Sequence, residues 1–337
     1  MAFERVAVLD VEYNEQGLKS AVIDIPNGFA YFGCGSTTGR VVKVDLATFL
    51  RSGGLIFAAG TLSPASAVID QANGFAYFGP DMATPILQKL KLSDFTLLTP
   101  LTLDPVEDYL MAAVIDPTNG FAYFGTRTNP PYVVKVRLSD FTSLGHLELT
   151  TGLPYIYCAV IDTLHGFAYF GNGSTPARIF KVKLSDFTLD ATLAFETGEN
   201  NVHAAVIDPT NGYAYFATQT APSLIVKVRL SDFTRVGALE LTEGDDNIAS
   251  GVIDTVNMMA YFGTTTAPAR IISVDLSSFS RLTAITLETG ENYAYSAVID
   301  TVNGFSYWGL GTAPGKVLKF GTKLADHFSN MMLMGVD

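Results

Sequence analysis

The stretch AAVIDPTNGYAYFATQTAPSLIVKVRLSDFTRVGALELTEGDDNIAS, from Ala204 to Ser250, decides the fold. Its Val-Ile-Asp signature returns every 46 residues, at Asp24, Asp70, Asp116, Asp162, Asp208, Asp254 and Asp300. Self-similarity at a fixed period of this length is typical of repeat architectures, in which each unit is one supersecondary motif. The chain therefore consists mainly of seven copies of one unit.

Each unit contains four short β-type runs separated by turn residues, and none of the runs has helical periodicity. In the quoted copy we expect strands at the Ala-Val-Ile-Asp run, at 213–217, at 225–230 and at 235–241. Four strands per unit predict one blade of a propeller. The sequence thus predicts an all-β fold, a seven-bladed β-propeller of four-stranded antiparallel blades.

The two ends of the chain complete one blade between them. A phenylalanine recurs in the second hairpin of each unit, but position 325, where the period places the seventh one, is alanine. Phe3 stands 21 residues before Asp24, as Phe233 stands before Asp254. We expect residues 3–13 to supply the fourth strand of the last blade, so that hydrogen bonds close the ring. Residues 1–324 would form a single domain, and 325–337 a C-terminal tail or strap.

Residues that recur in every copy are expected to be structural, because every blade needs them. Residues that differ between copies are the candidates for binding a ligand. The repeat aspartate is expected to cap its hairpin through backbone N–H groups. A turn glycine recurs in six copies, and Met258 replaces it in a conformation expected to be left-handed. A lysine also recurs in six copies, with Ser273 as the exception. We interpret it as a scaffold residue whose head pairs with an acid; the alternative is a ring of ammonium groups for an anion.

The Val-Ile-Asp, Ala-Tyr-Phe-Gly-Thr (260–264) and Val-Lys-Val-x-Leu elements resemble the YVTN-type β-propeller repeats of bacterial and archaeal surface-layer and other extracellular proteins. The resemblance covers residues 3 to about 322; the tyrosine matches, and the Val, Thr and Asn of the family name do not. It implies surface display, adhesion or structural assembly, in an extracellular or cell- or particle-surface location. It carries no catalytic residues.

Composition excludes several classes of partner. The formal charge is -12, from 21 Lys plus Arg against 33 Asp plus Glu, with no basic run, so nucleic acid is not expected as a partner. No apolar stretch approaches the roughly 20 residues that span a bilayer, so no membrane insertion is expected. The N-terminus has neither a basic nor an apolar leader segment, and we expect no signal peptide in this chain. Cys34 and Cys158 are expected to be buried or idle thiols.

The most divergent positions lie five and seven residues before each repeat aspartate, where loops are expected to surround the axial mouth. Tyrosine, asparagine and histidine there can stack on sugar faces or hydrogen-bond a polar ligand. The alternative is drift at weakly constrained channel positions. The candidate binding residues are Tyr109, Tyr155, Tyr157, Asn201, His203, Asn247, Tyr293 and Tyr295.

Nine residues before the aspartate, five of the seven copies are acidic. Such carboxylates, if they surround the mouth, would suit Ca²⁺, which takes six to eight oxygens. The alternative is that they belong to ordinary solvated turns, and no cofactor is expected otherwise. The weak metal candidates are Glu15, Glu107, Glu199, Asp245 and Glu291.

These observations predict a non-catalytic binding or structural propeller that engages a glycan or protein partner through its axial mouth or blade surface. One alternative is an axial-site enzyme, a lyase or hydrolase with or without a metal; the four histidines occupy unrelated repeat positions and offer no motif. Another is an assembly subunit of a surface layer, filament or particle, or a homo-oligomer, that docks through its tail. Asn172-Gly-Ser174 is a glycosylation sequon.

Overall fold

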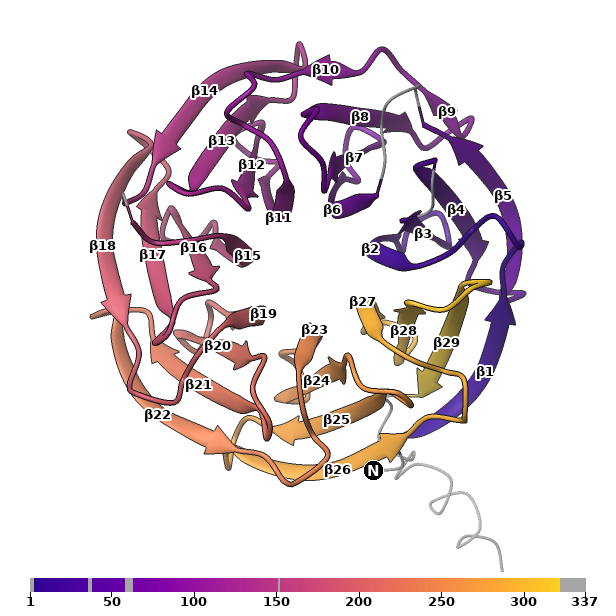
Figure 1. The fold of residues 1–337 in the computed structure, drawn as a ribbon. Helices are drawn as coiled ribbons and strands as arrows, with labels where there is room; N and C mark the ends of the chain where they lie inside the picture. The colour runs from indigo at the N-terminus through magenta and orange to yellow at the C-terminus, as the bar shows by residue number, and fades with distance from the viewer. Residues whose placement is uncertain (1–2, 36–37, 58–62, 151, 322–337) are drawn as a thin grey trace, which may run out of the picture.

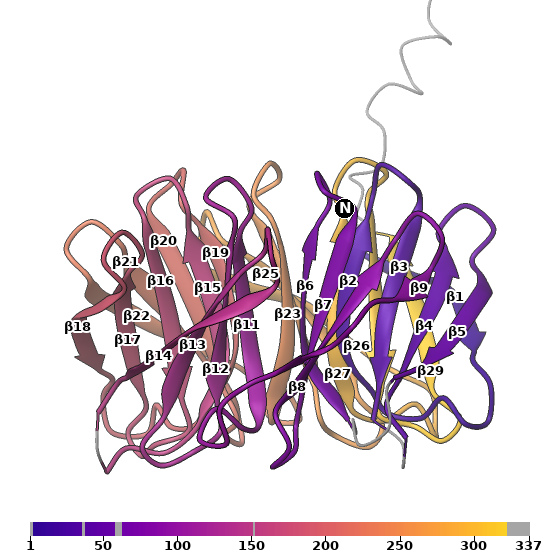
Figure 2. The ribbon, with the colours of Figure 1, turned by 90° about the horizontal axis from the view of Figure 1, so that it is seen from above.

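The computed structural model describes residues 3–35, 38–57, 63–150 and 152–321, and in them seven antiparallel sheets stand in a ring (Figure 1). The first strand of each blade faces the axis, and Figure 2 shows the strands running between the two faces of the ring. These innermost strands are β2 (Leu18–Asp24), β6 (Pro64–Asp70), β11 (Leu110–Asp116), β15 (Ile156–Asp162), β19 (Val202–Asp208), β23 (Ile248–Asp254) and β27 (Ala294–Asp300). The prediction of an all-β, seven-bladed propeller is confirmed.

The other strands follow outward in chain order. The second strands are β3 (Phe29–Cys34), β7 (Phe75–Pro80), β12 (Phe121–Thr126), β16 (Phe167–Asn172), β20 (Tyr213–Thr218), β24 (Met259–Thr264) and β28 (Phe305–Leu310). The third strands are β4 (Arg40–Asp45), β8 (Ile86–Lys91), β13 (Tyr132–Arg137), β17 (Arg178–Lys183), β21 (Leu224–Arg229), β25 (Arg270–Asp275) and β29 (Lys316–Gly321). The outermost strands are β5 (Leu50–Ile56), β9 (Thr96–Leu97) with β10 (Leu101–Thr102), β14 (Thr142–Glu148), β18 (Thr188–Ala194), β22 (Thr234–Glu240), β26 (Ser280–Thr286) and β1 (Glu4–Asp10).

The outermost strand of the last blade comes from the start of the chain. β1 pairs antiparallel with β29, with Glu4 opposite Gly321 and Asp10 opposite Lys316. In the β6–β10 blade the outer strand is broken into β9 and β10 around Pro100, which has no N–H to donate to the ladder. The tail at 325–337 lies outside the described residues. Within the described residues no helix is long and apolar enough to cross a membrane.

The core lies between neighbouring blades. The repeated tyrosines and the aromatic residues that follow them are buried, and the apolar clusters join residues of consecutive blades. All seven repeat aspartates are buried, and six accept a backbone N–H of their hairpin as predicted: the backbone N–H and side-chain amide of Asn211, for example, both donate to the Asp208 carboxylate. At Asp24 the side-chain amide of Asn27 donates to the carboxylate. Met258 is left-handed, with φ 54°, as predicted. Cys34 and Cys158 are both buried and free, and burial raises the pKa of each thiol.

The recurring lysine binds aromatic rings rather than an acid. The Lys43 ammonium lies 3.7 Å from the ring centroid of Phe29 and 5.5 Å from that of Phe95 in the next blade. Among the six described lysines at this position, Lys181 alone forms an ion pair, to Asp190 at 3.0 Å. The predicted carboxylate partner is therefore wrong for five of the six copies, because the ammonium sits over ring faces between two blades.

Candidate functional site at the axial mouth

Three stacked rings of side chains line the channel along the axis. On each innermost strand the residues five, three and one before the aspartate are half-exposed, while those between them are buried. The ring next to the turn is isoleucine in all seven copies, and the middle ring is alanine in six, with Gly251 in the seventh. The third ring, here called the variable ring, consists of Lys19, Ala65, Met111, Tyr157, His203, Ala249 and Tyr295.

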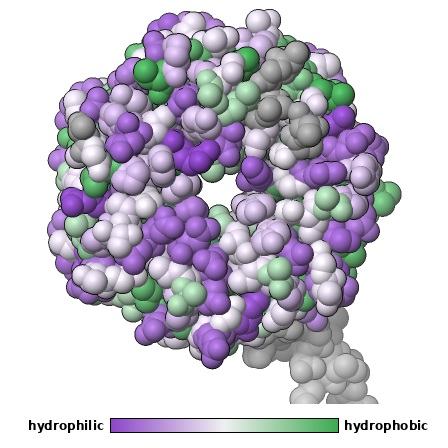
Figure 3. Space-filling model, in the orientation of Figure 1, coloured by the Kyte–Doolittle hydropathy of each residue, from purple (hydrophilic) through white to green (hydrophobic). Residues whose placement is uncertain are grey.

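The variable ring lines a cavity of about 250 Å³ at the face that carries the loops between blades. All seven of its residues contribute, together with Gln219 and Thr265, which directly follow β20 and β24. Figure 3 views this face and shows a hollow centre bordered largely by hydrophilic residues. The structure thus brings Tyr157, His203 and Tyr295, three of the predicted binding residues, into one cavity.

A small side chain at Ala249 leaves a notch between His203 and Tyr295. In the blades with a tyrosine at this position, a glycine follows the second strand: a Cβ on Gly173 would lie 2.5 Å from the Tyr157 ring, and one on Gly311 would meet the Tyr295 ring. The blade with Ala249 carries Thr265 instead of that glycine. Both tyrosines of the variable ring therefore have a glycine behind them, and the notch exists because Ala249 is small.

His203 and Tyr157 form the aromatic wall of the cavity. Their rings stack with centroids 3.9 Å apart and planes 20° apart. Burial lowers the pKa of His203 to about 4, so the imidazole is neutral at physiological pH. The buried Nε2 of His203 has no hydrogen-bond partner among the described residues. Because this nitrogen is buried, the imidazole presents its ring surface to the cavity.

The opposite side of the mouth carries charge. The Lys19 ammonium donates a hydrogen bond of 2.7 Å to the Ser63 hydroxyl and lies 3.8 Å from Asp81. Arg127 donates to the same Asp81 carboxylate at 2.6 Å and covers the ring of Tyr109. Asp81, Arg127, Gln219 and Thr265, each of which directly follows the second strand of its blade, were not among the residues predicted from the sequence. Their signal was available, since this position also differs between copies.

The positions seven before the aspartate flank the cavity and do not line it. They precede the innermost strand, and all seven are left-handed, with φ of 47–60°. They are therefore not extended, and their side chains do not follow the strand's alternation between its two sides. Tyr155, for example, donates its N–H to Thr128 of the preceding blade and accepts from Gly173. The backbone here is scaffold, and Tyr109, Tyr155, Asn201, Asn247 and Tyr293 share this conformation. The rings of Tyr155 and Tyr293 contact the variable ring, with centroids 6.1 Å from Tyr157 and 5.9 Å from Tyr295, and the ring of Tyr109 lies under Arg127.

The five candidate carboxylates for Ca²⁺ are occupied by the protein itself. Each is buried and held by a basic side chain that also ties the incoming loop to the outer strand of its blade. Arg235 binds Glu199 at 2.5–3.0 Å, for example, and the Glu196 N–H donates to the same carboxylate. The described residues contain no cluster of three or more His, Cys, Asp or Glu placed to hold a metal ion. The pairs are Glu15–Arg51, Glu107–His146, Glu199–Arg235, Asp245–Arg281 and Glu291–Arg5.

One blade replaces this ion pair by two leucines. Leu153 and Leu189 occupy the positions equivalent to Glu199 and Arg235, one period earlier in the chain. Both leucines pack against the same apolar cluster. Acid and base are thus kept together or lost together, which identifies the pair as structural. The sequon residue Asn172 is likewise structural: it is buried, and its side-chain oxygen accepts from Ser174 and Arg178.

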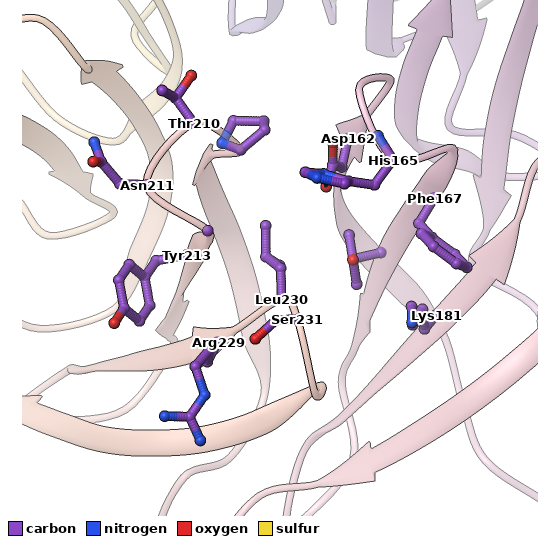
Figure 4. Close-up of a pocket in the computed structure, with 13 residues that line it drawn as sticks. Asp162, His165, Phe167, Lys181, Thr210, Asn211, Tyr213, Arg229, Leu230 and Ser231 are labelled. Carbon is purple, nitrogen blue, oxygen red and sulfur yellow. Dashed lines mark hydrogen bonds and ion pairs between the residues drawn. The ribbon is translucent and has the colours of Figure 1, made fainter.

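A second kind of cavity lies between neighbouring blades, beside the turns that follow the innermost strands. Figure 4 shows the groove between the β15–β18 and β19–β22 blades, about 550 Å³, where His165 and Lys181 face Tyr213 and Arg229. Equivalent residues line a groove of about 480 Å³ between the last and first blades. The charged groups in the larger groove are already paired: His165 with Asp162, Lys181 with Asp190, and Arg229 with Asp232. The axial cavity, which is lined by the residues that differ between the copies, is the stronger candidate.

No protein-family model matches the chain, and no curated protein sequence matches it significantly. The resemblance to YVTN-type repeats therefore rests on the quoted motifs and on the seven-bladed propeller fold.

Proposed function

We propose that this protein is a non-catalytic carbohydrate-binding propeller whose axial mouth holds one sugar ring of a glycan. The proposal rests on one observation: the seven blades differ in sequence at the ring of residues that lines the axial cavity. The isoleucine and alanine rings of the channel are nearly invariant, whereas the variable ring differs from blade to blade and lines a cavity. A scaffold requirement would have repeated; a single asymmetric ligand requires this divergence.

The lining suits a sugar. Tyr157, His203 and Tyr295 offer aromatic surface to the C–H faces of a pyranose, and Gln219 and Thr265 offer hydrogen bonds to hydroxyls. A volume of 250 Å³ lies just below the roughly 300–1,000 Å³ of pockets for drug-sized ligands, so a single ring fits better than an extended chain. The resemblance to extracellular repeat proteins supports placing this binding at a cell or particle surface.

A thermal-shift screen against a panel of mono- and oligosaccharides tests the proposal, because a ligand that binds the native state raises Tm. The informative variant fills the notch: Ala249→Tyr together with Thr265→Gly, the combination that two other blades already carry. We expect at least one sugar to raise Tm of the wild type and to have no effect on the filled variant. Tyr13→Ala, at an exposed tyrosine outside the cavity, is the matched control and should respond like the wild type.

Two results would contradict the proposal. If no saccharide changes Tm, the mouth has no sugar ligand, and weight moves to a protein partner or to assembly. If the filled variant responds as strongly as the wild type, the sugar binds elsewhere, and the inter-blade grooves become the candidates.

A further inference from the structure

The axial cavity carries one positive charge. Among the described residues that line it, Lys19 is the one cationic side chain, and the others are alanine, methionine, tyrosine, glutamine, threonine and the neutral His203. The lining contains no carboxylate. In a chain with a formal charge of -12, this cavity is locally electropositive.

The Lys19 ammonium also keeps hydrogen-bonding capacity. An ammonium has three donors, and within the described part of the chain one of them is used, to the neutral Ser63 hydroxyl. The distance of 3.8 Å to Asp81 exceeds hydrogen-bond length, and the Asp81 carboxylate is held at 2.6 Å by Arg127. Asp108 lies near Arg127 as well, and burial raises the pKa of that carboxyl. The single Asp81 carboxylate is therefore shared by two cations: it hydrogen-bonds Arg127 and lies at ion-pair distance from Lys19, whose ammonium also lines the cavity.

The order of the strands places this charge beside the proposed sugar site. Around the axis β2 neighbours β27, which neighbours β23, which neighbours β19. Lys19, Tyr295, the Ala249 notch and His203 therefore follow one another along one arc of the mouth. A ring held between Tyr295 and His203 would have the ammonium at one end and neutral hydrogen-bonding groups at the other.

From this arrangement we infer that the preferred ligand is an acidic sugar, a hexuronic acid residue whose carboxylate pairs with the Lys19 ammonium. The inference rests on the proposed function and names the ligand class for the same site. Charge-assisted hydrogen bonds to a carboxylate are stronger than neutral ones, so the acid group should dominate selectivity. Repulsion from the remaining negative charge of the protein is screened beyond about 8 Å at physiological salt. The nearby Lys19 ammonium therefore determines the preference for acidic over neutral sugars.

The test compares matched pairs of sugars. Calorimetric titrations with oligosaccharides of glucuronate and galacturonate are set against those of glucose and galactose, for the wild type, for Lys19→Met and for Lys183→Met. Methionine already stands in the variable ring as Met111, so the blade accepts it. Lys183 pairs with Asp186 outside the cavity, and its loss changes the net charge by the same amount. We expect the acidic sugars to bind at least about tenfold more tightly than the neutral ones, a preference that Lys19→Met abolishes and Lys183→Met keeps.

The outcomes separate the two claims. Equal binding of the acidic and neutral sugars by the wild type would overturn the inference and leave the proposed function in place. An acid preference that survives in Lys19→Met would also overturn it, because another group would then be reading the carboxylate. Binding of neither class would overturn both claims. Raising the salt concentration gives an independent check: it should weaken binding of the acidic sugars and leave binding of the neutral ones unchanged.

Discussion

The inter-blade interfaces and the axial mouth lie on the same blades, yet differences between copies have opposite effects in the two regions. In the contacts that hold the blades together a departure in one residue is accompanied by a departure in its partner, as where Leu153 and Leu189 replace the acid and base that tie an incoming loop to the outer strand of its own blade. At the mouth the side chains of the variable ring differ from blade to blade and line an open cavity. Interfaces are thus constrained by stability, and the mouth is open to selection for a ligand.

The interface between the β23–β26 blade and the last blade shows the same constraint in a second pair. It has Ser273 in place of the lysine and Met259 in place of the aromatic residue that the lysine covers. Phe3 and Tyr261 then stack, with centroids 4.7 Å apart, whereas the equivalent rings are 6.0 Å apart at Tyr31–Phe95, where Lys43 is present. The lysine acts as a wedge between rings of neighbouring blades, and without it the rings close on each other.

The largest effect is expected from breaking an acid–base pair that ties an incoming loop to the outer strand of its blade. Arg235→Leu leaves the buried Glu199 carboxylate without its bidentate partner, and removing one member of a buried pair is strongly destabilising. Because Arg235 is partly exposed, we expect a loss of about 3 kcal/mol, at the low end of measured values. The double variant Glu199→Leu, Arg235→Leu reproduces the leucine blade and should recover most of the stability. Urea unfolding measures both.

A matched control is Arg229→Leu, which removes a solvent-exposed pair with Asp232 and should leave stability close to that of the wild type. If the double leucine variant is as unstable as the single one, the two residues are not exchangeable as a unit. The claim that structural residues change in pairs, whereas residues at the mouth change singly, would then be contradicted by its best example.

The blade count and the strands were predictable because a 46-residue period repeats the same turn chemistry seven times. Boundaries were less accurate: the third strand of the quoted copy was expected at 225–230 and lies at Leu224–Arg229, because Leu230 instead donates its N–H to Gly212 in the adjoining turn. The acids before each blade were wrongly placed at the mouth because spacing along the chain does not show which side chain, 36 residues later, folds back to bind them. Divergence between copies identified the residues at the mouth. The shape of the cavity could not be predicted, because it depends on how the residues after the second strands pack behind the variable ring.

The next largest effect is the pH dependence of stability that arises from His203 at the mouth. The pKa of His203 is lowered in the folded state, so the unfolded chain takes up a proton between about pH 6.5 and pH 4 that the folded chain does not. Stability is therefore lost as the pH falls through this window, by about 2 kcal/mol at pH 5 relative to pH 7. His203→Ala, with alanine as in two other blades, should lose less stability over the same range. Equal pH profiles for the two proteins would show that the imidazole is not held neutral by burial.

A smaller loss is expected from removing one wedge. Lys135→Ser takes away an ammonium 4.2 Å from the Phe121 ring and 5.4 Å from the Phe187 ring of the next blade. We expect a destabilisation of about 1 to 2 kcal/mol, the range of a desolvated cation–π contact, measured by urea unfolding. Lys183→Ser, at an exposed position, serves as the control. A variant as stable as the wild type would mean that the rings close as readily here as Phe3 closes on Tyr261.

The smallest change in stability is expected where the functional effect is largest. Ala249→Tyr alone should push against Thr265, and such overpacking typically costs about 1–3 kcal/mol. Adding Thr265→Gly removes the obstruction, because Gly173 leaves the same space under Tyr157. The double variant should therefore unfold within about 0.5 kcal/mol of the wild type while losing the sugar. If the glycine does not restore stability, the match between ring size and glycine is coincidental, and the mouth is constrained as tightly as the interfaces.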